Sequence, residues 1–540
     1  MAGRHIVDAV PMEPTGAGTG AGHRLAGAAL LIMSATTLSR VFGYAREIVA
    51  ARYFGAGAEK SAFEVAFLVP STVQMLVAQA ALSAALIPIF TGLLEKDRRD
   101  EAWLVARTVF TVVTIALSIV VSLFIIFAPQ IMPVFAPGYR NDPAIMADIV
   151  TMTRLLFPTV VLLAITGVVI SILNSFEHFT LPAIAPILWN VVILAAIFLG
   201  YERLGIEALA WGVLLGTIIQ LVVQLPWLRG RGGSLGFSLA LKNRNVRRVG
   251  AMMLPVSLSL GLINLNGIVN VQFASFLGDT GVAAMIYAFR LYQLPEALFA
   301  IAVGTVLFPT LSRLAARGDP DAFRYTMTLG LRVIFFLLLP ISAVFLSLSE
   351  PIVRLAYEHG MFTAGDTSRV ASALFFFAFG SAFSGGSALL TRSFFSLGRP
   401  WKPTLLALAN LGLNALLNWL FIYPLGLGLS GIPLATSVVS ATMFMALLLL
   451  IRRELGRVDG RAILRSGASV AATSVAVAAA AYFSWRFLDA SLGRALGAQF
   501  ISLSTAMAGA AAVFLGIAWL TRMPELSFLK LIRRPSARTS

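Results

Sequence analysis

The sequence predicts an all-α polytopic membrane protein with fourteen transmembrane helices, arranged as two pseudo-symmetric six-helix lobes plus two C-terminal helices. Of its 540 residues, 58% are hydrophobic and 12% are charged, whereas soluble domains average about 45–50% and about 25%. The apolar residues form runs of about 20 or more, which is the length that spans a bilayer. These runs lack the period-two alternation of a barrel strand. A soluble enzyme is therefore excluded.

The chain begins with a segment, 1–22, that is rich in Gly, Ala, Pro and Thr. Such a composition is typical of a flexible tail, and the segment lacks the apolar core of a signal peptide. A second tail, 526–540, is basic. We expect both tails to lie on the cytoplasmic side.

Between these tails we expect fourteen spans. They lie near 25–51, 62–94, 104–128, 147–173, 183–200, 206–228, 249–277, 282–316, 327–349, 369–397, 403–424, 429–452, 463–487 and 498–521. Several exceed the minimum length, which indicates tilt or kinks. Pro70, Pro158 and Pro295 lie inside spans, and we expect kinks there.

The distribution of basic residues predicts the orientation. The net charge is +16, which in a soluble protein would suggest a nucleic-acid partner. With the N-terminus inside, however, 27 of the 41 basic residues fall in cytoplasmic loops and tails and eight outside, the latter including Lys60 and Arg354. This bias predicts that both termini are cytoplasmic and argues against nucleic acid. Cys is absent and only four His occur, so we expect no disulfide, metal centre or cofactor, and a coupling ion is left open.

The chain resembles itself at an offset of about 220 residues. Corresponding pairs are Pro88 and Pro309, Gly138 and Gly360, Pro182 and Pro403, and Asn190 and Asn410. Because six spans fit within one repeat, both copies keep the same orientation. The predicted organisation is a lobe at 23–230, a lobe at 231–455 and an added helix pair at 456–525. Two such lobes around a cavity are typical of transporters.

Six arginines fall within predicted spans. Arg107, Arg154 and Arg332 lie near span ends, where their side chains can reach the interface. Arg40, Arg46 and Arg290 lie deeper and must face protein or water. Arg40 and Glu47 share one stripe of the first span with Tyr44. The guanidinium fork suits phosphate, so these arginines predict an anionic substrate.

Other polar residues in the spans leave alternatives open. Glu47, Glu64 and Glu296 are candidate ion-pair partners for the arginines, which would make the pairing structural. Gln74 and Gln79 either line the same chamber or join helices by hydrogen bonds. Asparagines form polar groups in two spans: Asn264, Asn266 and Asn270 in the seventh, and Asn410, Asn414 and Asn418 in the eleventh. Helix–helix hydrogen bonding is favoured for them, with cation coordination as the alternative.

Several motifs resemble the MviN/MurJ lipid II flippases of the MOP exporter superfamily. The first is Ser39-Arg40-Val41-Phe42-Gly43-Tyr44-Ala45-Arg46-Glu47 followed by Ala51-Arg52-Tyr53-Phe54-Gly55-Ala56-Gly57. Others are Ala136-Pro137-Gly138-Tyr139, Ile172-Leu173-Asn174-Ser175-Phe176, Tyr287-Ala288-Phe289-Arg290-Leu291 and Arg392-Ser393-Phe394-Phe395-Ser396. The resemblance covers roughly 25–525 and implies two six-helix lobes plus two helices whose groove holds a lipid tail.

The resemblance implies a flippase that moves undecaprenyl-diphosphate-linked peptidoglycan precursor across the bacterial inner membrane. It assigns diphosphate binding to Arg40, Arg46 and Arg290 and the acidic position to Glu47. The chain departs from the family in the second helix, where no basic residue follows Pro70 and Ser61 and Gln79 replace acids. Asparagines also stand where the family's proposed sodium site uses carboxylates.

The predicted function is therefore lipid II flipping by alternating access, in the service of cell-wall synthesis and without covalent chemistry. The partners expected are the lipid-linked anionic substrate, membrane lipid and the cell-wall synthesis machinery. Three alternatives remain: a flippase for another prenyl-diphosphate-linked saccharide, a non-transporting envelope scaffold, and a multidrug-type exporter of soluble substrates. Three cavity arginines disfavour the last, because it would carry organic cations.

Overall fold

The computed structural model describes residues 18–77, 79–456 and 459–526, with only the backbone described for 18–33, 75–77, 79–81, 84, 254–264 and 301. Within these ranges the chain is helical and contains no strand, as predicted. Helix α1 begins at Gly18, inside the segment 1–22 expected as a tail; residues 1–17 and 527–540 lie outside the description.

Nine α-helices precede the long central connection. They are α1 (Gly18–Phe54), α2 (Ala58–Val77), α3 (Gln79–Leu94), α4 (Arg99–Ile126), α5 (Ala128–Phe135), α6 (Pro143–Leu156), α7 (Pro158–Ser175), α8 (Thr180–Leu204) and α9 (Glu207–Val222), with the short turns η1 (Pro137–Tyr139) and η2 (Leu225–Leu228).

Ten α-helices follow it in the described chain. They are α10 (Arg244–Ser275), α11 (Gly281–Pro295), α12 (Ile301–Arg317), α13 (Pro320–Tyr357), α14 (Ala364–Ala378), α15 (Ser381–Ser396), α16 (Trp401–Ile422), α17 (Gly431–Leu455), α18 (Gly460–Leu492) and α19 (Leu496–Leu520), with η3 (Glu296–Ala300) and η4 (Gly428–Ser430).

The described residues confirm a multi-pass helical protein but not the count of fourteen spans. Ten stretches are long and apolar enough to cross a membrane, and the pair α14–α15, bent by 48°, makes an eleventh. Each of the eleven coincides with one predicted span. The predicted spans 25–51, 62–94 and 249–277 fall on α1, on α2 with α3, and on α10. These helices are not among the eleven, and each includes residues whose side chains are not described.

Breaks within the spans follow the prolines in part. Pro158 starts α7 immediately after α6, and Pro295 ends α11, where the backbone changes to the π-helical turn η3. Proline causes both breaks because it cannot donate the helical hydrogen bond. Pro70 lies inside α2.

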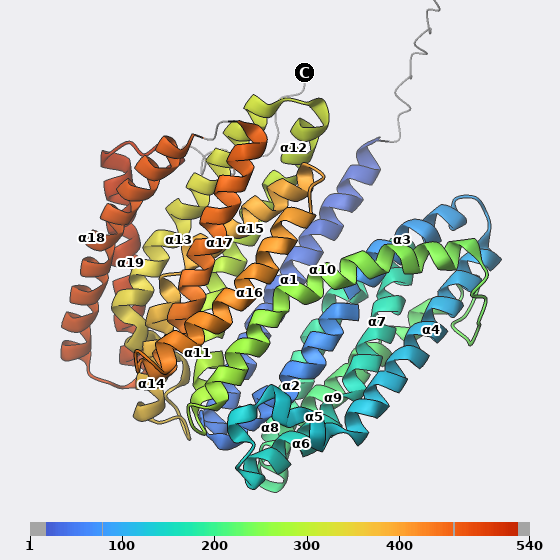
Figure 1. Ribbon diagram of the computed structural model, residues 1–540, viewed down its shortest axis with the longest axis horizontal. Helices are drawn as coiled ribbons and strands as arrows, with labels where there is room; N and C mark the ends of the chain where they lie inside the picture. Colours follow the sequence, from blue (N-terminus) through green and yellow to red (C-terminus); the bar gives the residue numbers. More distant parts are fainter. Residues whose placement is uncertain (1–17, 78, 457–458, 527–540) are drawn as a thin grey trace, which may run out of the picture.

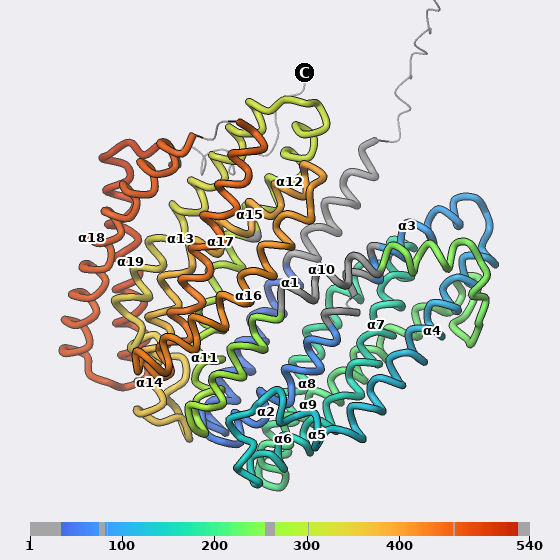
Figure 2. The backbone as a smooth tube through the Cα atoms, in the orientation of Figure 1, coloured from blue at the N-terminus to red at the C-terminus, as the bar shows by residue number. Residues whose placement is uncertain are grey.

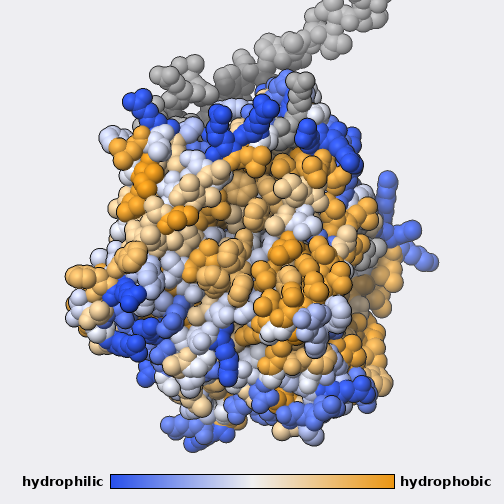
Figure 3. Space-filling model, turned by 60° about the vertical axis from the view of Figure 1, so that its left-hand side comes forward, coloured by the Kyte–Doolittle hydropathy of each residue, from blue (hydrophilic) through white to orange (hydrophobic). Residues whose placement is uncertain are grey.

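The helices form two groups (Figure 1), with the described parts of α1 and α10 running between them (Figure 2). Helix α1 packs on α8 and touches α13, while α10 contacts α2 and α3 on one side and α16 on the other. Seen from the side, hydrophobic side chains dominate the middle of the molecule and hydrophilic ones gather toward its ends (Figure 3). Outward-facing Leu199, Val475 and Trp519 are 71–84% exposed, which suits contact with lipid.

The central connection, residues 229–243, contains the predicted lobe boundary. It runs beside α4, where Arg107 Nε donates to the Ser234 carbonyl at 2.7 Å and the Ser238 N–H donates to Thr111 Oγ1 at 3.0 Å. These bonds satisfy backbone groups that no helix pairs. Arg107 therefore binds this connection.

The C-terminal helices α18 and α19 are fixed to α13 near both of its ends. Near one end, Arg332 pairs with the buried Glu525 at 2.7 Å, and Ser466 Oγ donates to the same carboxylate at 2.6 Å. Near the other, Arg354 lies 3.5 Å from Asp489. Arg354 was predicted as an external loop charge, but it is only 6% exposed, because α13 extends to Tyr357 and carries it against α18.

The Arg332 pair gives a stability prediction. Arg332→Ala leaves the Glu525 carboxylate buried without its cation, a change that costs up to about 3 kcal/mol. We expect a lower midpoint of thermal unfolding in detergent, followed by tryptophan fluorescence. Arg317→Ala, at an exposed position at the end of α12, is the matched control. Equal midpoints for the two variants would show that the pair does not hold the helices together.

Candidate functional site

Five charged side chains from α1, α2 and α11 form one ion network. Arg46 Nη2 lies 2.7 Å from Glu47 Oε1, and Lys60 Nζ lies 2.6 Å from Glu64 Oε1. Arg290 joins the helices, because it pairs with Glu64 Oε2 at 3.0 Å and also with Glu47. The network thus connects the two halves of the chain.

The two carboxylates and the lysine of the network are buried, whereas the side chains of Arg46 and Arg290 keep 15% and 21% exposure. Glu47, Lys60 and Glu64 are only 4%, 1% and 3% exposed. Removing one member would leave an uncompensated buried charge, which is strongly destabilising. Three bases face two carboxylates, so the network carries a formal excess of one positive charge.

Helix geometry places these residues together. Lys60 and Glu64 are four positions apart on α2 and therefore share a face. Arg46 and Glu47 are adjacent and point in directions about 100° apart. Glu47 therefore faces α11, while the Arg46 guanidinium stacks over Trp189 of α8 at 4.9 Å. The cavity that remains among them is only about 10 Å³, which is room for a single water molecule. In this conformation the side chains of the network leave no space for a larger ligand.

Close backbone contacts seal the molecule beside the network. A Cβ on Gly138 would lie 2.3 Å from the Ser275 carbonyl, and a Cβ on Gly360 would lie 2.3 Å from the Arg52 carbonyl. Gly138 and Gly360 are the repeat-related pair, and each contacts the end of the first helix of the other half, α10 or α1. Any larger residue would separate these contacts, so glycine is required at both positions.

Hydrogen bonds reinforce this seal. Ser61 Oγ donates to the Asp279 carbonyl at 2.5 Å and accepts from the Ala283 N–H at 3.2 Å. Tyr139, in η1, donates to the Gly278 carbonyl at 3.2 Å. Burial raises the pKa of Tyr139 to about 12, so its hydroxyl stays protonated and remains a donor across the neutral range.

The structure gathers four of the predicted site residues, Arg46, Glu47, Arg290 and Glu64, and separates others from them. Arg40 is exposed and lies six positions before Arg46, about 9 Å along the helix axis. Gln74 is half-buried on α2, ten positions, or about 15 Å, beyond Glu64. The side chains of Gln79 and Asn264 lie outside the described residues.

The asparagines join helices. Asn414 Nδ2 and Asn418 Nδ2 both donate to Asn270 Oδ1, at 2.8 and 2.9 Å, and Asn270 Nδ2 donates to Thr436 Oγ1 at 3.1 Å. Amide hydrogen bonds therefore connect α10, α16 and α17. Asn410 lies apart from this cluster and lines a cavity beside Glu296. Among the described residues, no group of three or more His, Cys, Asp or Glu side chains could hold a metal.

Lys60 is the site residue that the sequence prediction missed. It was counted as an external loop charge because it lies close to the turn between the first two spans. The structure instead places it in the first turn of α2 and buries it. The available signal was its spacing of four from Glu64, which predicts an ion pair once a helix begins before residue 60.

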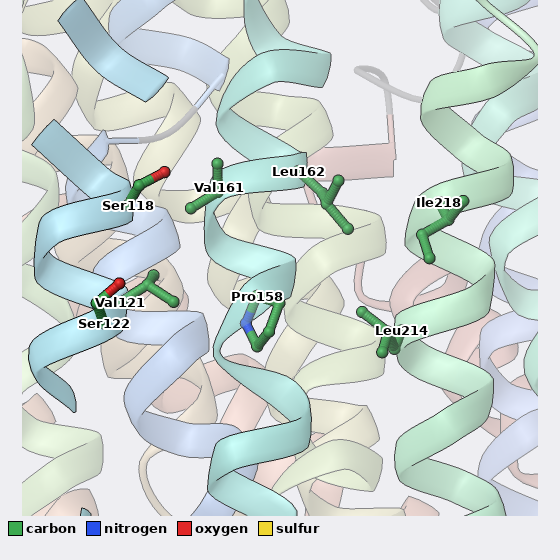
Figure 4. A pocket seen from close by; sticks show the side chains of 8 residues that line it. All are labelled: Ser118, Val121, Ser122, Pro158, Val161, Leu162, Leu214 and Ile218. Atoms are coloured by element: carbon green, nitrogen blue, oxygen red, sulfur yellow. The ribbon is translucent and has the colours of Figure 1, made fainter. Parts of the chain in front are cut away.

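A second concavity does not suit an anion. It lies among α4, α7 and α9, has a volume of about 410 Å³ and is open to the surface (Figure 4). Its lining is apolar apart from Ser118 and Ser122. A depression without charge is suited to lipid chains and cannot neutralise a diphosphate.

Comparisons with known proteins agree with the predicted resemblance. The family model described as lipid II flippase MurJ matches residues 50–501. The lipid II flippase MurJ of Burkholderia cenocepacia is 33% identical over 79% of this chain and 84% of its own length. A probable lipid II flippase of Rhizobium meliloti is 30% identical over 92% and 94%.

Solved structures show the same fold. A lipid II flippase MurJ in an inward closed conformation matches with a TM-score of 0.76 at 23% identity, over 94% of this chain and all of that one. A multidrug resistance MATE family transporter of the MOP superfamily, in an inward-facing conformation, matches with a TM-score of 0.65 at 15% identity, over 79% and 98%. By its sequence, this chain belongs to the MurJ family of lipid II flippases.

Proposed function

We propose that this chain moves lipid II from the inner to the outer leaflet of the bacterial inner membrane by alternating access, without covalent chemistry. The observation that carries the proposal is the ion network. It holds three bases against two carboxylates, and it draws them from both halves of the chain. An excess of cation at the junction of two moving bodies suits an anionic head group.

In the proposed mechanism, the diphosphate replaces the carboxylates as partner of the bases. Arg40 is exposed and makes the first contact with the head group. Phosphate oxygens then compete with Glu47 and Glu64 for Arg46, Lys60 and Arg290, since guanidinium binds phosphate and carboxylate in the same bidentate manner. Loss of the carboxylate pairs releases α11 from α1 and α2. The halves then separate at the sealed end, while the prenyl tail stays in lipid.

We further propose fourteen spans with both termini cytoplasmic, which puts the sealed end at the outer face. The proposed lobes are 23–230 and 231–455, with 456–525 as an added helix pair and 526–540 as a basic cytoplasmic tail. The reciprocal contacts of Gly138 and Gly360 support a two-fold relation between the lobes. Cell-wall synthesis enzymes, which consume the flipped lipid, are the proposed partners.

A flippase for another prenyl-diphosphate-linked saccharide would use the same bases, because the diphosphate is shared. The likeness to multidrug transporters favours a soluble-substrate exporter by fold only. The net positive network speaks against organic cations as its cargo. A non-transporting scaffold binds no diphosphate, so it would have no need for the exposed arginine at position 40. The following experiment separates these possibilities.

Arg40 provides the cleanest test, because an exposed side chain can be removed without disturbing packing. In cells depleted of their own flippase, we expect Arg40→Ala to lower outer-leaflet lipid II at least tenfold, about 1.4 kcal/mol. The outer-leaflet lipid II of Arg40→Lys should lie between that of Arg40→Ala and that of the unmodified chain, since an ammonium keeps the charge but lacks the planar fork of the guanidinium. Arg317→Ala should match the unmodified chain. Arg290→Ala, tested in parallel, should abolish transport.

Full restoration of outer-leaflet lipid II by both Arg40→Ala and Arg290→Ala would refute diphosphate binding by these residues. Failure of the unmodified chain itself to restore outer-leaflet lipid II would refute lipid II as its substrate. In that case, vesicles that contain another prenyl-diphosphate saccharide would test the first alternative.

Lys60 and Glu64 should be energetically coupled. We expect the double variant Lys60→Met, Glu64→Gln to be less destabilised than the sum of the two single variants, by about 0.5–3 kcal/mol. Denaturant titrations in detergent provide the measurement. The exposed pair Asp97 and Arg99 is the matched control and should couple by less than about 1 kcal/mol. Additive effects at Lys60 and Glu64 would contradict a shared network.

A cross-link at the seal should stop transport. Because the chain contains no cysteine, Ser61→Cys with Ala283→Cys can be tested in the otherwise unaltered protein. The 3.2 Å bond between Ser61 Oγ and the Ala283 N–H brings the two backbones within the range that a disulfide bridges. We expect oxidation to block lipid II flipping and reduction to restore it, with the transport activity of each single-cysteine variant insensitive to the oxidant. Undiminished transport by the oxidised, cross-linked protein would exclude opening at this end.

A further inference from the structure

A cavity lies inside the second half of the chain, separate from the ion network. Its volume is about 570 Å³, and α10, η3, α15, α16 and α17 surround it. Glu296 and Arg392 are the charged residues of its lining, and Asn266, Asn410, Ser384 and Ser440 add polar groups. It reaches Pro403 and Thr404, so it extends toward the turn between α15 and α16.

The cavity contains polar atoms that the protein itself does not satisfy. Asn266 Oδ1 and Ser387 Oγ are buried and have no hydrogen-bond partner in the described structure. Buried polar atoms of this kind are normally bonded to water, and the cavity is large and polar enough to hold it. The cavity therefore offers space for water between the α15–α16 turn and Glu296.

Glu296 is a carboxylate at membrane depth that the described residues do not neutralise. Ser384 Oγ donates to its Oε1 at 2.7 Å, and no base of the described chain forms an ion pair with it. Arg392, the cation of the lining, donates to Thr305 Oγ1 at 3.2 Å instead. An intramembrane carboxylate in this position marks a functional site.

Few other titratable groups face Glu296. Tyr292 of α11 interacts with it and also with Ser384 and Ser440, and Arg392 approaches from α15. The lining contributed by α10, α16 and α17 contains no titratable side chain.

The local backbone also singles out this position. Glu296 is the first residue of the π-helical turn η3, and single π-turns within α-helices are frequent at functional sites. Arg290 of the ion network lies six positions earlier in the same span, about 9 Å along the axis. Glu296 therefore lies where the α-helix that carries Arg290 changes to a π-turn.

We propose that Glu296 is a proton-binding site, reached through this cavity, whose protonation accompanies the conformational cycle. One proton from the bulk solution, which reaches Glu296 through the cavity, binds the carboxylate and converts it to a neutral carboxyl group. That group can then donate to the Ser384 hydroxyl, which reverses the present direction of their hydrogen bond. The link to transport rests on the proposed function, but the proton site itself does not.

Infrared difference spectroscopy of the full-length protein in lipid tests the site directly. Between about pH 4 and pH 9, where perturbed carboxyl groups titrate, the unmodified chain should show a protonated-carboxyl band that Glu296→Gln lacks. Glu202→Gln, at an exposed position of α8, should retain it. An unchanged band in Glu296→Gln would overturn the proposal. So would a band that responds to sodium at constant pH but not to pH, since it would indicate a metal cation.

The water path has its own test in the cysteine-free chain. Thr391→Cys, on the cavity wall and partly exposed, should react with a small hydrophilic thiol reagent, whereas Ser393→Cys, which is fully buried on the same helix, should not. An inert Thr391→Cys would overturn the path. Both measurements work without transport, so they decide the proton site even if the chain flips no lipid II. If it does, Glu296→Gln should make flipping independent of pH, and unchanged pH dependence would refute coupling.

Discussion

The structure depends on the need to neutralise charge inside the membrane by other protein charges. A lone arginine at that depth costs at least about 2.5–3.5 kcal/mol on insertion scales, and Arg290 avoids this cost by pairing with Glu47 and Glu64 of the other half. The same pairs hold α11 against α1 and α2. The same ion pairs therefore close the molecule and neutralise its buried bases. Any ligand that offers equivalent negative charge to the bases weakens the closure.

Closure at this end also has a geometric requirement. The carboxylates reach Arg290 only because the two halves approach each other at backbone distance, at Gly138 and Gly360. The two contacts are reciprocal, since each glycine meets the end of the first helix of the opposite half. Two repeats related by a two-fold axis make two equivalent contacts, and both contacts must break before the halves can separate. This arrangement favours a rigid-body change over local movement of one loop.

Much of the fold could be predicted from the sequence. The length of the apolar runs follows from the thickness of the bilayer, and the offset of about 220 residues follows from a six-span unit that occurs twice. Eleven predicted spans coincide with helices that are long and apolar enough to cross a membrane. The predicted spans that contain Arg40, Gln79 and Asn264 include residues that the structure does not describe in full. Ion pairing of the intramembrane arginines was one of the predicted alternatives, and it holds for Arg46 and Arg290 with Glu47 and Glu64. Arg40 and Glu296, which were grouped with them, lie outside the network, because polarity alone does not tell which groups a helix brings together.

Lys60 and Arg354 escaped prediction for a physical reason. Charge counting assigns a base near a span end to the adjacent loop, but a helix that extends beyond the apolar run carries such a base into the protein. The partner then decides the outcome. Lys60 is buried because Glu64 lies one turn later on the same face. Arg354 also has a local partner, Glu350, one turn earlier at 3.0 Å. Its second partner, Asp489 of α18, is more than 130 residues away, and no local pattern reveals that contact.

The span from α11 through η3 to α12 connects the two polar regions of the molecule. Arg290 faces the first half and is held by its carboxylates, while Glu296 faces the cavity of the second half. The π-turn begins at Glu296, so the continuous helix that holds Arg290 in position ends there. A change of charge at Glu296 alters the hydrogen bond to Ser384 of α15, which is a contact across that joint. The helix is thus anchored at Arg290 by ion pairs and at Glu296 by a single hydrogen bond. Because the second anchor is the weaker of the two, it is the one that a single proton can change.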